Sequence, residues 1–100
     1  MSDIFAMRRA NGDWFTLDHH GRLRVPLFRS SKDATIARMR NFGLLVFKPM
    51  LLDTRLLKDI APLPGENEVE FFIVDDPFAS LKRGSTVGRT ELDSLIHSSL

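Results

Sequence analysis

Short segments of alternating apolar and polar residues, separated by tight-turn sequences, constrain the N-terminal part of this chain more than any other feature. Residues 4–8 precede Asn11-Gly12, a dipeptide typical of two-residue hairpin turns. A second segment follows Asp13 and ends at the turn 18–21, and a third covers residues 22–28. Their period of two is the one that a sheet with one solvated face requires. We therefore predict a three-stranded antiparallel meander.

The alternation also predicts which side chains share a face of this meander. If Phe15 and Leu17 pair with Val25 and Leu23 on the core side, Trp14 lies on the opposite face. Arg22 and Arg24 lie on that opposite face too. Basic and aromatic side chains on an open sheet can contact phosphates and stack on bases. Two other interpretations remain open: Arg24 forms a surface cation–π pair with Trp14, or a helix covers this face.

The rest of the chain predicts two more strands and three helices. Pro26 has no N–H to donate and indicates an edge or a strand end. Ser30 or Ser31 caps a helix that ends near Asn41 and Gly43. The further elements are a buried strand over 44–47 ended by Pro49, a helix capped by Asp53 or Thr54 and ended by Pro62, a strand over 68–74, a flexible loop over 82–90 and a helix over 91–100.

These elements define the fold class that we expect. It is a single α+β domain over residues 1–100, in the order β-β-β-α-β-α-β-α. The sheet is mostly antiparallel with about five strands, and the helices pack on one of its faces.

Composition excludes several classes of function. The chain has no cysteine, which rules out disulfides, thiolate metal sites and a cysteine nucleophile, and suits a cytoplasmic protein. The longest apolar run, residues 42–47, is far short of the roughly 20 residues of a spanning helix. The first ten residues lack the apolar core of a signal peptide. We expect a soluble cytoplasmic protein without a membrane partner.

The two halves of the chain carry opposite charge. Residues 1–48 hold nine Lys/Arg against four Asp/Glu, and residues 49–100 hold five against nine. Either these charges intersperse on the folded surface, or they form a basic face that attracts an anionic partner. The residues of such a basic surface are Arg22, Arg24, Arg38 and Arg40. The pI of about 8.2 is below the value of about 9 typical of nucleic-acid-binding domains.

The basic loop over 82–90 superficially resembles a phosphate-binding loop. Its two glycines are one residue too close, and Arg89 stands where that loop has lysine. Backbone N–H groups and basic side chains at the start of the last helix can still hold a phosphate or carboxylate. The candidate anion-binding residues are Lys82, Arg83, Ser85, Arg89 and Thr90. The alternative is a solvated loop, and no cofactor is predicted.

Neither the histidines nor the paired acids predict a catalytic or metal site. His19-His20 lie in a turn, and the third histidine, His97, is remote in the sequence. Asp75-Asp76 precede a proline, where acids commonly serve turns and caps. We predict no catalytic residues and no metal ligands, and a role for His19 or His20 remains open.

Some apolar residues exceed what one thin core needs. They are Phe71-Phe72, Phe78 and Met50-Leu51-Leu52. Either they cover a second copy or another protein, or they pack under the helices.

One family has a similar arrangement. The chain contains Leu23-Arg24-Val25-Pro26-Leu27-Phe28 followed by a Ser-capped helix near Asp33-Ala34. Lys48-Pro49-Met50 and Val74-Asp75-Asp76-Pro77 follow at suitable positions. Over roughly residues 13–77 this order resembles the N-terminal domains of SseB-type proteins, which are small bacterial modules named for enhanced serine sensitivity. The resemblance implies an α+β fold with an antiparallel sheet and brings no catalytic residues with it.

Two functions therefore compete on sequence alone. The first is a non-enzymatic protein-interaction or regulatory module of a bacterial cytoplasm that forms a homo-oligomer or binds another protein. The second is an anion- or nucleic-acid-binding domain that uses the basic N-terminal half and the 82–90 loop.

Overall fold

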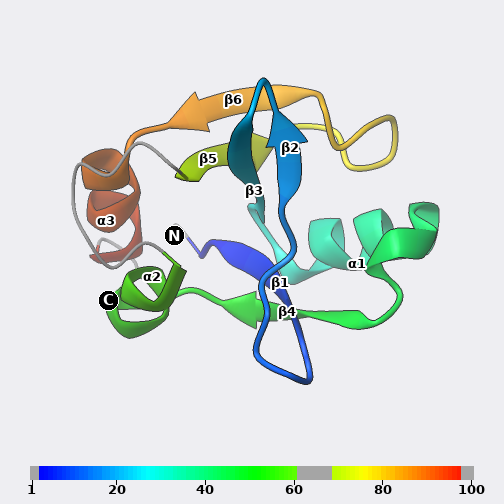
Figure 1. Cartoon of the computed structure of the whole chain (residues 1–100), viewed down its shortest axis with the longest axis horizontal. Coiled ribbons are helices and arrows are strands. Elements are labelled where there is room, and N and C mark those ends of the chain that lie inside the picture. The colour runs from blue at the N-terminus through cyan, green and yellow to red at the C-terminus, as the bar shows by residue number, and fades with distance from the viewer. Residues whose placement is uncertain (1–2, 61–68, 98–100) are drawn as a thin grey trace.

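A mixed six-stranded sheet forms the centre of the molecule (Figure 1). Its strands follow the order β4-β1-β3-β5-β6, and β2 pairs with β3 beside this path. The computed structural model describes residues 3–60 and 69–97. The elements are β1 (Phe5–Arg9), β2 (Leu17–His19), β3 (Arg22–Phe28), α1 (Ser31–Arg40), the 3-10 helix η1 (Phe42–Leu44), β4 (Phe47–Leu51), α2 (Thr54–Ile60), β5 (Val69–Val74), β6 (Gly84–Val87) and α3 (Arg89–His97). The α+β class is as predicted.

Among the strands that the structure describes, one pair is parallel. β3 and β5 run in the same direction, whereas β1–β3, β1–β4, β2–β3 and β5–β6 are antiparallel. The sheet is therefore mostly antiparallel, as expected, with one more strand than the five predicted. In the described part of the chain, no helix is long and apolar enough to cross a membrane.

Helices cover both faces of the sheet, so the prediction that they pack on one face was wrong. In Figure 1, α2 and α3 lie together on one side and α1 lies on the other. Leu57, Leu92 and Ile96 pack with one set of sheet residues, and Ala34 and Ala37 with another. Four consecutive buried residues in β3, 25–28, and four in β5, 71–74, supply both cores. An unbroken buried run requires cover on both faces.

The pairing of β2 with β3 is shifted by one residue from the predicted register. Leu17 lies opposite Arg24, and Asp18 lies opposite Leu23. Because side chains alternate with a period of two, this shift places Leu17 on the same face as Arg24. Residues 14–15 pair instead with β1, through a bridge between Arg8 and Trp14 and a hydrogen bond from Phe15 N to Met7 O of 2.8 Å.

Both predicted turns of the meander are present. At the first, Gly12 has a φ of +96°, and Arg9 N donates to Asp13 O at 2.9 Å. At the second, His20 and Gly21 have φ values of +54° and +81° between the paired residues His19 and Arg22. Two successive positive φ values are the signature of a two-residue type I′ hairpin, whose twist matches that of the strands.

Pro26 lies inside the central strand β3 and does not mark an edge or a strand end. Up to Arg24, the antiparallel neighbour of β3 is β2, and from Leu27 it is β1. Pro26 falls where this partner changes, an interruption of the ladder at which a missing N–H is tolerated.

The predicted strand over 44–47 begins later and continues past Pro49. Residues 42–44 form η1, residues 45–46 turn, and β4 runs from Phe47 to Leu51 at one edge of the sheet. Met7, the partner of Pro49, directs its carbonyl oxygen away from β4, to Phe15 N. Met7 and Pro49 are therefore a non-hydrogen-bonded pair, and the ring nitrogen of Pro49 faces the open edge.

The predicted loop over 82–90 contains a strand and the start of a helix. β6 pairs with β5 from Gly84 opposite Val74 to Val87 opposite Phe71. A Cβ atom on residue 84 would overlap the carbonyl group of Ile73, so this approach requires glycine. The predicted C-terminal helix begins at Arg89, and residues 98–100 lie outside the described residues, as do Pro62 and Glu68.

Candidate interaction surface

The four arginines of the predicted basic surface do not act as one surface. Arg24 is 11% exposed, donates from Nη2 to Glu70 Oε1 at 3.1 Å and lies 4.1 Å from the centre of the Phe72 ring. Arg38 Nη2 donates to Leu45 O at 2.8 Å. Arg22 is exposed on β3 and Arg40 is exposed at the end of α1. Two of the four thus serve internal contacts.

The platform predicted from Trp14, Arg22 and Arg24 is not assembled. Trp14 packs against the core beneath α2 and α3, whereas Arg24 lies over Phe72 on the α1 side of the sheet. Trp14 Nε1 donates to Asp59 Oδ2 at 2.8 Å. The guanidinium 4.9 Å from its ring centre belongs to Arg8, so the predicted Arg24–Trp14 pair was wrong. The one-residue shift in register accounts for this difference.

The candidate anion-binding residues of the 82–90 segment are spread out along the chain. Lys82 and Arg83 precede β6, Ser85 lies within it opposite Ile73, and Arg89 and Thr90 begin α3. Four extended residues span about 13 Å, which separates the two basic ends. A single anion therefore does not contact both ends.

The histidines and paired acids serve turns. The rings of His19 and His20 lie edge to face, with 4.3 Å between their centres. Asp75 pairs with Arg29 at 3.5 Å, and Asp76 Oδ1 accepts from the backbone N–H groups of Phe78 and Ala79. Across residues 3–60 and 69–97, no three His, Cys, Asp or Glu residues are grouped to hold a metal ion.

One hollow of about 360 Å³ lies beside β2, lined in part by His19, His20, Arg24 and Lys82. Arg24 forms an ion pair with Glu70, and Asp18 adds a carboxylate to the lining. The positive charge of this hollow is therefore largely balanced within the chain.

The largest departure from expectation is a cluster of exposed apolar residues at the end of α1. Among the described residues, four of the seven large apolar side chains that are exposed fall within residues 39–46, which we call the 39–46 segment. They are Met39 (78% exposed), Phe42 (92%), Leu45 (50%) and Val46 (61%). The sequence pattern predicted 44–47 as a buried strand. The end of α1 at Arg40, with Asn41 as its C-cap, is as predicted, whereas the 3-10 helix and the turn that follow it were not predicted.

The predicted apolar surplus is exposed only in part. Phe71, Phe72 and Leu52 are buried in the two cores, as in the alternative of packing under helices. Phe78 is 59% exposed and Leu51 is 50% exposed.

The 39–46 segment is held in place by hydrogen bonds and by one buried side chain. Asn41 Nδ2 donates to Ala37 O at 2.7 Å, which caps α1. The bond from Arg38 to Leu45 O ties the turn back to the helix. The side chain of Leu44, which precedes Leu45 in this turn, is fully buried. The apolar side chains are therefore exposed on a fixed backbone.

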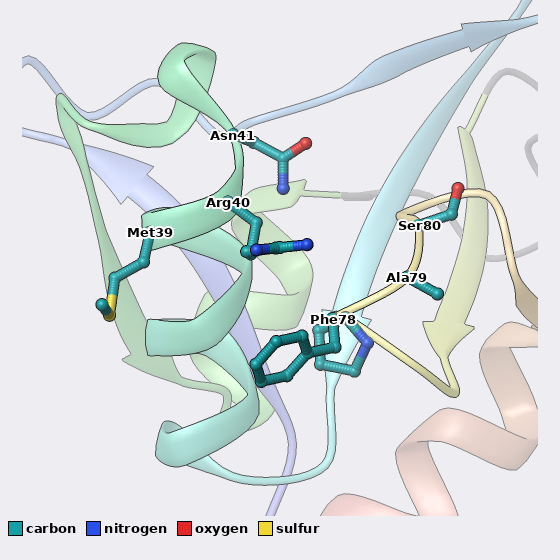
Figure 2. Close-up of a pocket in the computed structure, with 7 residues that line it drawn as sticks. Met39, Arg40, Asn41, Phe78, Ala79 and Ser80 are labelled. Atoms are coloured by element: carbon teal, nitrogen blue, oxygen red, sulfur yellow. The ribbon is translucent and has the colours of Figure 1, made fainter.

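A hollow of about 290 Å³ adjoins this segment (Figure 2). Its walls are the end of α1, from Met39 to Asn41, and the turn 77–80. Figure 2 shows the Arg40 side chain extending from α1 towards this turn, above the ring of Phe78. The Arg40 guanidinium carbon lies 5.0 Å from the Phe78 ring centre. The hollow thus combines a cation and an aromatic face.

Comparison with known proteins adds no further constraint. No protein-family model, no curated protein and no solved structure matches this chain. The resemblance to SseB-type domains stays a prediction.

Proposed function

We propose that this chain is a non-enzymatic protein-interaction module whose contact surface is the 39–46 segment together with Phe78. The observation that carries the proposal is the exposure of Met39, Phe42, Leu45 and Val46 within eight residues. Fully burying a large apolar side chain is favourable by about 1.5–3 kcal/mol. Concentrated exposure of such side chains is typical of a protein surface that a partner covers.

The rigidity of the segment supports the proposal. Binding costs free energy whenever loops and side chains become ordered. Here Asn41, Arg38 and the buried Leu44 already hold the backbone. A partner therefore meets a surface whose backbone is ordered in advance.

The charge of the surrounding chain indicates the kind of partner. Between Ala34 and Leu52 the sequence has three cations, Arg38, Arg40 and Lys48, and no carboxylate. Two copies meeting through this surface would bring like charges together. We therefore infer that the partner is another protein with an apolar and acidic surface. Homo-oligomerisation stays a prediction that sedimentation velocity tests.

Selection of peptides on the intact chain tests the proposal. Random twelve-residue peptides are displayed on phage and selected on the immobilised protein, and the enriched peptides are titrated by fluorescence anisotropy. We expect enrichment of peptides that combine apolar and acidic residues. Phe42→Ser is expected to weaken their binding at least tenfold, because the phenyl ring is the most exposed apolar group of the surface.

The matched control is Leu23→Ser, which removes a side chain that is 49% exposed on β3. We expect it to leave peptide binding unchanged. Equal loss for both variants, or the absence of any enriched peptide, overturns the proposed function. Binding of single-stranded DNA that weakens steeply with salt would instead favour an anion- or nucleic-acid-binding domain.

A further inference from the structure

We propose that the hollow between α1 and the turn 77–80 receives the carboxylate of a partner's Asp or Glu side chain, with Arg40 as its main ligand. This inference rests on the proposed function, since the hollow adjoins the 39–46 segment through Met39. It identifies the chemistry that selects the partner.

The size of the hollow fits one side chain. Pockets for drug-sized ligands generally have volumes of about 300–1,000 Å³. The hollow, at about 290 Å³, lies just below this range and is partly open to solvent. One side chain of a bound protein can enter while its neighbour in the sequence contacts Met39 or Phe42.

The electrostatics of the hollow favour an anion. Within the described chain, Arg40 has no ion pair: its recorded contact is the Phe78 ring. The two carboxylates nearest in sequence to the turn have other partners. Asp75 forms an ion pair with Arg29, and Asp76 accepts hydrogen bonds from the backbone N–H groups of Phe78 and Ala79. The guanidinium therefore keeps its donors for a ligand, and its planar fork matches a carboxylate.

Two further lining groups can donate to the same anion. Ser80 Oγ accepts from Lys82 N at 3.0 Å, which leaves its own hydroxyl proton available. Asn41 uses its amide group on Ala37 O, and one Nδ2 hydrogen remains beyond that bond. Arg40, Ser80 and Asn41 all line the hollow and come from both of its walls. This donor set is suited to an acceptor-only group such as a carboxylate.

Two capped dipeptides that differ only in charge test the inference. Acetyl-Leu-Glu-amide and acetyl-Leu-Gln-amide are titrated into the intact ¹⁵N-labelled protein, and the Arg40 side-chain Nε–H resonance is followed with the amides of residues 39–41 and 78–80. We expect the glutamate probe to shift these resonances with a millimolar dissociation constant. The glutamine probe is expected to bind at least fivefold more weakly.

Arg40→Gln is expected to abolish the preference for glutamate. The matched control is Lys48→Gln, which removes an exposed cation of the same acid-free stretch outside the hollow and should retain the preference. Equal binding of the two probes, or equal loss in both variants, overturns the inference. Saturation of the same resonances by inorganic phosphate at lower concentration than by the glutamate probe would also overturn it, because a free anion would then be the better ligand.

The enriched phage peptides separate this inference from the proposed function. If Phe42→Ser weakens them and Arg40→Gln does not, the carboxylate site is wrong and the interaction surface stands. If Phe42→Ser leaves them unaffected while the glutamate probe still binds at Arg40, the proposed function fails by itself.

Discussion

Two arginines of this chain lie over phenylalanine rings, and their surroundings differ. Arg24 lies 4.1 Å from the centre of Phe72, and Arg40 lies 5.0 Å from the centre of Phe78. The Arg24 side chain is 11% exposed and has Glu70 as a partner at 3.1 Å. Arg40 is exposed, and the ring beneath it is 59% exposed. The same pair of residue types is thus buried and neutralised at one place and open at the other.

The comparison shows what determines the role of an arginine that the sequence places on the surface. Arg24 lies opposite Leu17 in β2 and beside Glu70 in the parallel strand β5. Its positive charge is paired with Glu70, and this ion pair links β3 and β5. Arg40 ends a helix and has no carboxylate within ion-pair distance among the described residues. Burial and an available counter-charge, rather than residue type, separate a structural cation from a binding one.

The largest expected effect is on the buried pair. Glu70→Ala should lower the free energy of unfolding by about 3 kcal/mol, because it leaves the Arg24 guanidinium buried without a counter-charge. Urea denaturation measures the change. The control is Asp75→Ala, which breaks an ion pair whose side chains are 53% and 62% exposed and should cost less than about 1 kcal/mol. Similar losses in both variants would remove the distinction drawn between buried and open cations.

The two rings should differ by a smaller amount. Phe72→Leu should destabilise the protein by about 1–2 kcal/mol, because the ring is 4% exposed and its loss leaves a gap in the core. Phe78→Leu should cost about 0.5 kcal/mol, mainly the cation–π contact with Arg40. Thermal unfolding of the two variants in parallel checks the order. A reversed order would mean that Phe78 belongs to the core and not to the contact surface.

The smallest effect is expected at Arg40 itself. Arg40→Gln should change the free energy of unfolding by less than about 0.5 kcal/mol, since the side chain is exposed and makes no ion pair within the described residues. Its effect should be confined to binding. A loss as large as that of Glu70→Ala would identify Arg40 as structural and would contradict the comparison directly.

Local patterns predicted much of the fold. Asn11-Gly12 and the turn before Arg22 form as expected, and Ser30 Oγ accepts from Asp33 N at 3.0 Å as a helix cap. Each of these features depends on a few neighbouring residues, whose conformational preferences are strong enough to read from the sequence.

The errors concern pairings between distant segments. A shift of one residue between β2 and β3 placed Trp14 and Arg24 on opposite faces of the sheet. The two-residue turn His20-Gly21 fixes this register, whereas the sequence pattern indicated only a turn within residues 18–21. The consecutive apolar residues 71–74 are typical of a strand covered on both faces, whereas the alternation in the N-terminal segments is typical of a sheet with one solvated face. Gly84 has low strand propensity and was interpreted as part of a loop, and the strand exists because this glycine can approach β5.

The candidate site was predicted least well, because it depends on the conformation of the chain after α1. The helix ends near Asn41 as predicted, but the expected strand over 44–47 would have buried its side chains. The 3-10 helix and the turn at 45–46 instead leave Phe42, Leu45 and Val46 in solvent. Arg40 contacts Phe78, which lies in a turn about forty residues further along the sequence. A local sequence pattern cannot predict such a contact.

Pro49 limits the ways in which a partner can use this end of the molecule. Its ring nitrogen faces the open edge of β4, in the middle of the strand. A strand from another chain that lay along this edge would lack one hydrogen bond at the middle of β4, which disfavours growth of the sheet into a larger assembly. Pro49 therefore favours partners that contact the side chains of the neighbouring 39–46 segment over partners that add a strand to the sheet.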